Sequence, residues 1–220
     1  MPAPILFIHG PWLPWDCWAG WRARYANASK VCLEPPLLDF PKAAAPSLAA
    51  VVDSYAARIA ELAEAPILIG HSLGGLVVQL LLDRGLGAAG IGVAAWPPRA
   101  RNRPPGASLL RASLSLLLAT PPNNALQGLP GLLPEALFTR STAISPANPG
   151  RPPLLLIAGS RDKVVTPGMV QQNHQLQLRA GSETSLRIFS GRGHLSITEP
   201  GWPDLADYCR AWADTRTLEP

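Results

Sequence analysis

A serine lies between two glycines in the stretch GHSLG at residues 70–74. The apolar run 66–70 before it is typical of a buried strand, and residues 72–84 have the spacing of a helix. A G-x-S-x-G pattern between a strand and a helix is typical of a sharp, strained turn that projects the serine hydroxyl. The positive end of the following helix favours negative charge that develops on this oxygen. We therefore expect Ser72 to act as a nucleophile.

A serine hydroxyl is a weak nucleophile until a base accepts its proton and a third group orients that base. In a strand–helix scaffold of this kind the expected chain order is serine, acid, histidine. Asp162 follows the apolar run 153–159, and His194 follows the run 185–189 in a loop bounded by glycines. Parallel sheets place their functional side chains at the carboxyl ends of strands. Asp162 and His194 are therefore the candidate acid and base.

Other residues compete for these two roles. Glu34 and Asp39 follow an early predicted strand and remain alternative acids. His174 is expected on the surface of a helix, and His9 is expected to be structural in the loop after the first strand. His71, inside the turn, is expected to point away from the serine. His194 is thus the favoured base.

Strands and helices alternate along most of the chain. Strands are predicted at residues 4–8, 30–33, 66–70, 90–95, 153–159 and 185–189, and helices at 46–65, 72–84, 171–180 and 202–213. Each predicted strand is apolar nearly throughout, as strands covered on both faces are. The pattern predicts the α/β class, with a doubly wound, mostly parallel sheet of about six strands.

Residues 97–152 break this alternation. The segment is rich in proline, has no clear strand and contains a leucine-rich predicted helix at 107–119. It is too proline-rich for a separate domain and too apolar for a linker. We interpret it as a small cap over the strand ends, with an irregular connection beside the sheet as the alternative. Residues 1–220 are thus predicted to form a single domain.

Composition excludes several classes of protein. Of 220 residues, 47% are hydrophobic and 15% charged, which excludes a disordered chain. The net charge of +4 comes from scattered arginines, so no nucleic-acid partner is expected. Three cysteines at unrelated spacings indicate neither a disulfide framework nor a metal site. No signal peptide or membrane span is recognised, and we expect a cytoplasmic protein that binds a small molecule and needs no cofactor or metal.

These motifs together resemble the α/β-hydrolase superfamily, and most closely its small esterase- or lysophospholipase-like members. The matching stretches are FIHGPW, IGHSLGGLVVQ, AWPPR, LLLIAGSRDKVVTP and GRGHLSITEPGW. The resemblance implies that Ser72 is the nucleophile, Asp162 the acid and His194 the general base. The antiparallel hairpin that usually begins the superfamily's sheet is expected to be missing, and the cap is expected to be short.

One position departs from the family pattern at the oxyanion hole. The resemblance assigns the two backbone N–H donors to Leu73 and to Pro11, but proline has no N–H. Loss of one such donor typically costs roughly a hundred- to a thousandfold in rate. Trp12 is the first candidate for a replacement donor, through its backbone or its indole N–H. His71 is the remaining residue expected beside this pocket.

Two alternatives to a replacement donor remain open. In one, the substrate is an activated ester or thioester; in the other, the site performs lyase or cyclase chemistry without a tetrahedral oxyanion. If Trp12 and the leucines of the cap line the site, its pocket is apolar; the alternative is that the same leucines pack on the sheet. We therefore expect a serine hydrolase of carboxylic esters or thioesters with an apolar acyl part. A cofactor-independent lyase or cyclase that uses Ser72 and His194 for proton transfer is the alternative, followed by a non-catalytic binding module.

Overall fold

The computed structural model describes residues 3–9, 13, 15–33, 47–100, 143–145 and 148–217. Its centre is a six-stranded sheet in which every pair of neighbouring strands is parallel. The strands are β1 (Ile5–Ile8), β2 (Cys32–Leu33), β3 (Ile67–His71), β4 (Ala89–Val93), β7 (Leu154–Gly159) and β8 (Thr184–Phe189). Their order is β2-β1-β3-β4-β7-β8. The predicted sheet is thereby confirmed.

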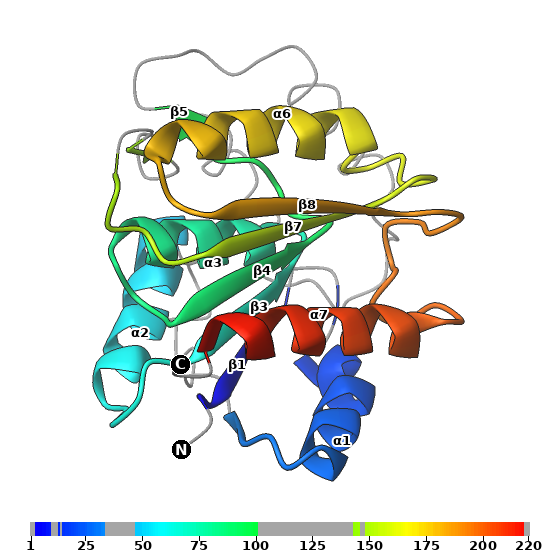
Figure 1. Ribbon diagram of the computed structural model, residues 1–220, viewed down its shortest axis with the longest axis horizontal. Coiled ribbons are helices and arrows are strands. Elements are labelled where there is room, and N and C mark those ends of the chain that lie inside the picture. The colour runs from blue at the N-terminus through cyan, green and yellow to red at the C-terminus, as the bar shows by residue number, and fades with distance from the viewer. Residues whose placement is uncertain are drawn as a thin grey trace.

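Helices cover both faces of this sheet. They are η1 (Trp15–Trp18), α1 (Ala19–Asn27), α2 (Leu48–Ala60), α3 (Leu73–Asp83), α6 (Pro167–Gln177), η3 (Leu178–Ala180) and α7 (Trp202–Thr217). Figure 1 shows α6 on one side of the strands and α7 with α1 on the other. Within the described ranges, no helix combines the length and the apolar character that crossing a membrane requires.

Alternation along the strands builds two separate cores. In β1, Leu6 and Ile8 pack in the cluster that contains α2, α3 and α6. Ile5 and Phe7 pack in the cluster that contains α1 and α7. Successive side chains of a strand point to opposite faces, so a strand covered on both faces must be apolar at every position. This requirement explains the continuous apolar runs in the sequence.

Two tryptophans of the N-terminal region belong to the second core. Trp18 and Trp21 are 1% and 0% exposed, and the Trp18 ring stacks on Phe7 with 5.0 Å between ring centroids. The indole N–H of Trp21 donates to the carbonyl of Ile197 over 2.9 Å. Both side chains therefore pack in the interior, and Trp21 also anchors the segment that follows His194.

Helix α6 begins earlier than the sequence pattern predicted. It starts at Pro167 rather than at residue 171. Thr166 is its N-cap, and the threonine hydroxyl accepts a hydrogen bond from Met169 N at 3.4 Å. Proline suits the first turn because its fixed φ is helical and no N–H is needed there. The apolar spacing alone did not contain this start signal.

A second, short pair of strands lies within the predicted cap. β5 (Arg99–Ala100) pairs in parallel with β6 (Ala143–Ile144), where the sequence showed no clear strand. Two-residue strands are too short to show an alternating pattern. Residues 101–142, including the predicted helix 107–119, lie outside the described residues. The position of the cap therefore stays a prediction.

Candidate active site

Ser72 occupies the turn between β3 and α3. Its backbone has φ 56° and ψ −118°, a conformation that L-residues rarely adopt. Its N–H donates to Val93 O at 3.0 Å, and its carbonyl accepts from the N–H groups of Gly75 and Trp96, each at 3.0 Å. These bonds hold the strained residue in place. The residue as a whole is 1% exposed.

Two glycines let three elements meet at this turn. A Cβ atom on Gly70 would lie 2.3 Å from Gly74 O, and one on Gly74 would lie 2.2 Å from Ile8 O. No side chain fits at either distance, so α3 approaches both β3 and the end of β1 more closely than any other residue allows. The glycines of the motif are therefore required by packing around Ser72.

The structure brings the three predicted triad side chains together. His194 Nε2 lies 3.2 Å from Ser72 Oγ, and His194 Nδ1 lies 2.8 Å from Asp162 Oδ2. A carboxylate can only accept, so Nδ1 carries the proton and Nε2 is free to accept one from the serine hydroxyl. The Asp162 side chain is fully buried and that of His194 is 15% exposed.

Asp162 is oriented by the turn that follows β7. Its Oδ1 atom accepts from Val164 N at 2.8 Å and from Val165 N at 2.9 Å. The second oxygen is thereby directed at His194. These two hydrogen bonds also replace part of the hydration that the carboxylate loses when it is buried.

In the loop that carries His194, residues that precede the histidine are hydrogen-bonded to residues that follow it. Gly193 N donates to the Glu199 carboxylate at 2.9 Å. The Arg192 guanidinium donates to Gly201 O, also at 2.9 Å. These bonds close the loop on itself and restrict the backbone of His194. Arginine, glycine and glutamate in the GRGHLSITEPGW stretch therefore have a structural role, which is to hold this loop closed.

The same loop lies against the end of β7. Arg161 N donates to Arg192 O at 2.9 Å, and a Cβ atom on Gly159 would lie 2.4 Å from that oxygen. Glycine at 159 therefore permits the close approach of the two loops. The approach sets the distance between Asp162 and His194.

His71 is buried directly behind His194. Its Nε2 atom lies 2.8 Å from the backbone oxygen of His194, and the two ring centroids are 4.9 Å apart. Burial lowers the pKa of His71 to about 3, with a smaller contribution from the neighbouring His194. The ring is thus uncharged, and its hydrogen bond goes to the histidine loop.

A buried cluster of amides supports the serine turn, and the sequence patterns did not reveal it. Gln79 Nε2 donates to Gly75 O at 3.0 Å and to Trp96 O at 3.1 Å. Gln79 Oε1 accepts from Asn173 Nδ2 at 2.9 Å and from Gln177 Nε2 at 2.8 Å. The spacing of Asn173 and Gln177, one helical turn apart, was the available signal.

The oxyanion residues are described only in part. Leu73 is the first residue of α3 and is 4% exposed. Its N–H is one of the four that a helix leaves without an internal acceptor. Pro11 and Trp12 lie outside the described residues, as do the alternative acids Glu34 and Asp39. Their assignments stay predictions.

Two other histidines lie in partly buried positions. His174 was expected on the helix surface, but its side chain is only partly exposed, and its Nε2 lies 3.2 Å from Thr184 O. His174 therefore lies at the edge of the contact between α6 and β8, where its ring is partly covered. His9 follows β1 and is partly buried, and burial lowers its pKa.

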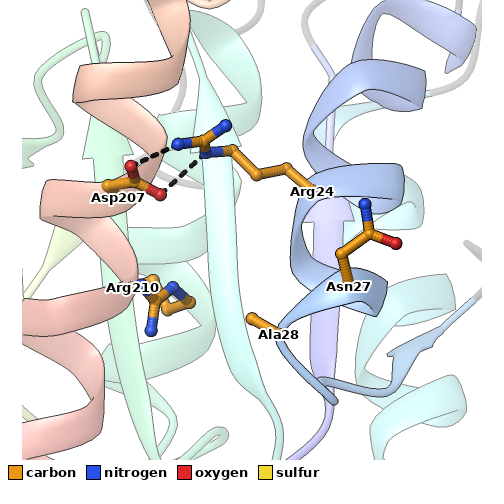
Figure 2. A pocket seen from close by; sticks show the side chains of 5 residues that line it. All are labelled: Arg24, Asn27, Ala28, Asp207 and Arg210. Atoms are coloured by element: carbon orange, nitrogen blue, oxygen red, sulfur yellow. Dashed lines mark hydrogen bonds and ion pairs between the residues drawn. The ribbon is translucent and has the colours of Figure 1, made fainter.

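A surface pocket of about 490 Å³ lies between α1 and α7 (Figure 2). It is lined by Arg24, Asn27, Ala28, Asp207 and Arg210. A two-pronged ion pair crosses it, with Arg24 nitrogens 2.7 and 2.5 Å from the Asp207 oxygens. None of the triad residues contributes to this pocket.

Comparison with known proteins supports the fold. A sequence model of the alpha/beta hydrolase family matches residues 5–207. The solved structure of MGS-MChE2, an alpha/beta hydrolase enzyme from the metagenome of sediments of the Mar Chica lagoon, Morocco, has a TM-score of 0.71 at 17% identity. That alignment covers 99% of this chain and 93% of the other.

Two further solved structures share the fold. A thermophilic esterase from Thermogutta terrifontis has a TM-score of 0.66 at 16% identity, with 98% of this chain and 91% of that chain covered. The monoacylglycerol lipase of Paleococcus ferrophilus has a TM-score of 0.67 at 16% identity, with 99% and 96% covered. No curated protein sequence matches this one. From the family match over nearly its whole length, the chain belongs to the alpha/beta hydrolase family of enzymes.

Proposed function

We propose that the protein is a serine hydrolase that cleaves carboxylic esters or thioesters with an apolar acyl part, through an acyl-enzyme on Ser72. The observation that carries the proposal is the chain of contacts from Asp162 to His194 and on to Ser72, at 2.8 and 3.2 Å. Membership of the alpha/beta hydrolase family supports it, as do the esterase and lipase that share the fold.

The order of proton transfers follows from His194, which carries its proton on Nδ1 and is free to accept one on Nε2. Ser72 Oγ attacks the acyl carbon while its proton passes to His194 Nε2. Asp162 accepts from Nδ1–H, holds the ring and stabilises the imidazolium that forms. The imidazolium then protonates the departing alcohol or thiol. A water molecule then attacks the acyl carbon and gives its proton to His194 Nε2. The bond from the acyl carbon to Ser72 Oγ breaks, His194 passes the proton to Oγ, and the carboxylic acid is released.

Leu73 N–H is the first oxyanion donor in this proposal. It follows Ser72 directly at the start of α3, where the helix presents unpaired N–H groups and the positive end of its dipole. Pro11 has no N–H to add. We assign the second donor to Trp12, through its backbone or its indole N–H, as a weaker replacement for the N–H that residue 11 lacks.

The apolar acyl preference draws support from apolar residues that lie next to the triad residues in the chain. Leu195 follows His194 directly and its exposed fraction is 48%. Val164 follows Asp162 by two residues and is partly buried. An acyl chain that covers Leu195 would remove apolar surface from water, at about 25 cal/mol per Å².

A covalent probe tests the nucleophile directly. Intact mass is measured after incubation with a fluorophosphonate for the wild type, Ser72→Ala and the control Ser54→Ala, whose serine lies on α2 and bonds to Ala50 O. We expect one adduct on the wild type and on the control and none on Ser72→Ala. Turnover of p-nitrophenyl acetate, p-nitrophenyl hexanoate and an acyl thioester is measured in parallel, and hexanoate should give the higher kcat/KM.

The remaining outcomes decide between the alternatives. Labelling without ester turnover directs the search to thioesters and supports only an activated serine. A folded wild type with neither labelling nor turnover contradicts the hydrolase and leaves the lyase or cyclase. A binding module would keep its ligand affinity in Ser72→Ala.

A further inference from the structure

His71 makes a contact that the proposed mechanism does not use. The residue precedes the nucleophile and is 2% exposed. Its Nε2 atom lies 2.8 Å from the backbone oxygen of His194, a residue 123 positions away. A side chain of the nucleophile turn thus touches the backbone of the base that serves the same serine.

The chemistry of this contact defines which atom carries the proton. A carbonyl oxygen can only accept, so Nε2 of His71 must donate. An uncharged imidazole has one N–H, and Nδ1 therefore carries the lone pair; this Nδ1 is buried and has no hydrogen-bond partner among the described residues. Burial lowers the pKa of His71 to about 3, which keeps this single tautomer from gaining a second proton near neutral pH.

The bond completes the fastening of the histidine loop. Gly193 N is held by Glu199 on one side of His194, and the Leu195 carbonyl accepts from Glu199 N at 3.0 Å on the other. His71 holds the carbonyl between these two anchors. A shift of this peptide would move the ring of His194 relative to Ser72 Oγ, and a misplacement of about 1 Å can cost a hundredfold in rate.

We propose that His71 is a positioning residue, whose Nε2–H holds the His194 carbonyl and thereby sets the distance between His194 Nε2 and Ser72 Oγ. The proposal rests on the proposed hydrolase function. A neutral donor is needed here, because a fixed positive charge 4.9 Å from the His194 ring would disfavour its protonation during the reaction.

Two amide variants of His71 differ in the length of the side chain but not in its ability to donate a hydrogen bond. In His71→Gln the side-chain amide nitrogen reaches about as far as Nε2, whereas in His71→Asn it stops short. We expect kcat per titrated active site to fall about 10- to 100-fold in His71→Asn, with KM within about twofold, and to stay within about threefold of wild type in His71→Gln. A merely space-filling role would give the opposite order or no difference.

A measurement without substrate keeps this test separate from the hydrolase proposal. Imidazole ¹⁵N–¹H spectra are recorded from pH 5 to 8 for the wild type, Ser72→Ala and both His71 variants. The chain has 4 histidines, so assignment by substitution is practical. We expect a non-titrating Nε2–H on His71 and a low-field Nδ1–H on His194 that exchanges with water faster in His71→Asn than in His71→Gln.

The outcomes are distinct. Protonation of His71 at Nδ1, or equal kcat and equal His194 spectra in the two variants, would overturn the positioning role. A folded wild type with neither fluorophosphonate labelling nor turnover of esters or thioesters would contradict the hydrolase, while the spectra would still decide whether His71 holds His194. Spectra of the wild type alone decide the tautomer if a variant does not fold.

Discussion

Asp162 holds His194 with one carboxylate oxygen and its own loop with the other. Oδ2 lies 2.8 Å from His194 Nδ1, while Oδ1 accepts from the backbone N–H groups of Val164 and Val165. The carboxylate is therefore oriented by the turn after β7, whether or not the histidine is in place. This orientation selects the tautomer of His194 that accepts a proton from Ser72.

Replacement of Asp162 by asparagine should reverse that tautomer. In Asp162→Asn, the two backbone N–H groups keep the amide oxygen, so the NH2 group faces His194 Nδ1. The proton of His194 then moves to Nε2, which no longer accepts from Ser72, and kcat should fall about 10³- to 10⁴-fold. The variants Glu34→Gln and Asp39→Asn serve as controls. A comparable loss in either control, with Asp162→Asn fully active, would assign the role of the acid to Glu34 or Asp39 instead.

Addition of an N–H at position 11 should speed the reaction. Pro11→Ala supplies the donor that proline lacks, and one oxyanion donor is worth roughly a hundred- to a thousandfold in kcat. We expect an increase in kcat for p-nitrophenyl esters that is larger than any change in Pro14→Ala, a neighbouring proline with no assigned role. An unchanged kcat in Pro11→Ala would show that Trp12 or another group already fills the position.

A methyl group at Gly74 should disrupt the serine turn. Its Cβ atom would lie 2.2 Å from the backbone oxygen of Ile8, so β1 and α3 must separate. We expect Gly74→Ala to lower the free energy of unfolding by about 1–3 kcal/mol or more, as overpacking does, and to reduce labelling of Ser72.

The control for this change is Gly168→Ala on α6. The nearest atom to its Cβ would be Thr166 Oγ1 at 3.9 Å, and its φ is not positive. We expect this variant to be slightly more stable than the wild type, by up to about 1 kcal/mol. Equal losses in the two variants, measured by urea unfolding, would contradict the packing argument.

The buried amide cluster should be needed for stability. Gln79→Met removes the acceptor for Asn173 and Gln177 and the donor to Gly75 and Trp96. Each buried group left without a partner costs about 1–3 kcal/mol, so unfolding should require at least about 2 kcal/mol less. A double-mutant cycle with Gln177→Met should show coupling, and additive effects would refute the network.

His71 should make the protein less stable as the pH falls. Its pKa is about 3 in the folded protein against 6.5 in the unfolded chain. Between these values the unfolded state binds the extra proton, so the free energy of unfolding decreases with falling pH by about 1.4 kcal/mol per unit. Stability due to the neutral ring is fully present above pH 6.5.

The measurement is the difference in unfolding free energy between the wild type and His71→Gln, taken by urea titration from about pH 7 to about pH 4.5. The difference should shift with that slope below pH 6.5. His9→Gln reports the separate share of His9, whose pKa is also lowered by burial. If the pH profiles of wild type and His71→Gln are parallel, the pKa of His71 is the same in the folded protein and in the unfolded chain, which contradicts the prediction.

Local patterns were sufficient to place most elements and the nucleophile turn. The runs that became β1, β3 and β7 are apolar, apart from His71 at the end of β3, because both faces of a parallel sheet are covered, so their places could be read directly. The GHSLG motif could also be recognised, because its two glycines are required by close contacts: Gly70 lies against the backbone of Gly74, and Gly74 lies against the end of β1. The start of α6 was misplaced, since its signal was a cap and a proline.

Residue types and their order were enough to predict the fold class and the candidates Ser72, Asp162 and His194. How close these three side chains lie became visible only in three dimensions. The bond from His71 to the backbone of His194, and the contact of Gln79 with an amide 94 residues away, also join elements that are far apart in the chain. Every residue has a backbone carbonyl, so a hydrogen bond to one cannot be predicted from the type of residue that carries it. The distances between the triad side chains follow from the packing of helices and loops on the sheet, which no local pattern encodes.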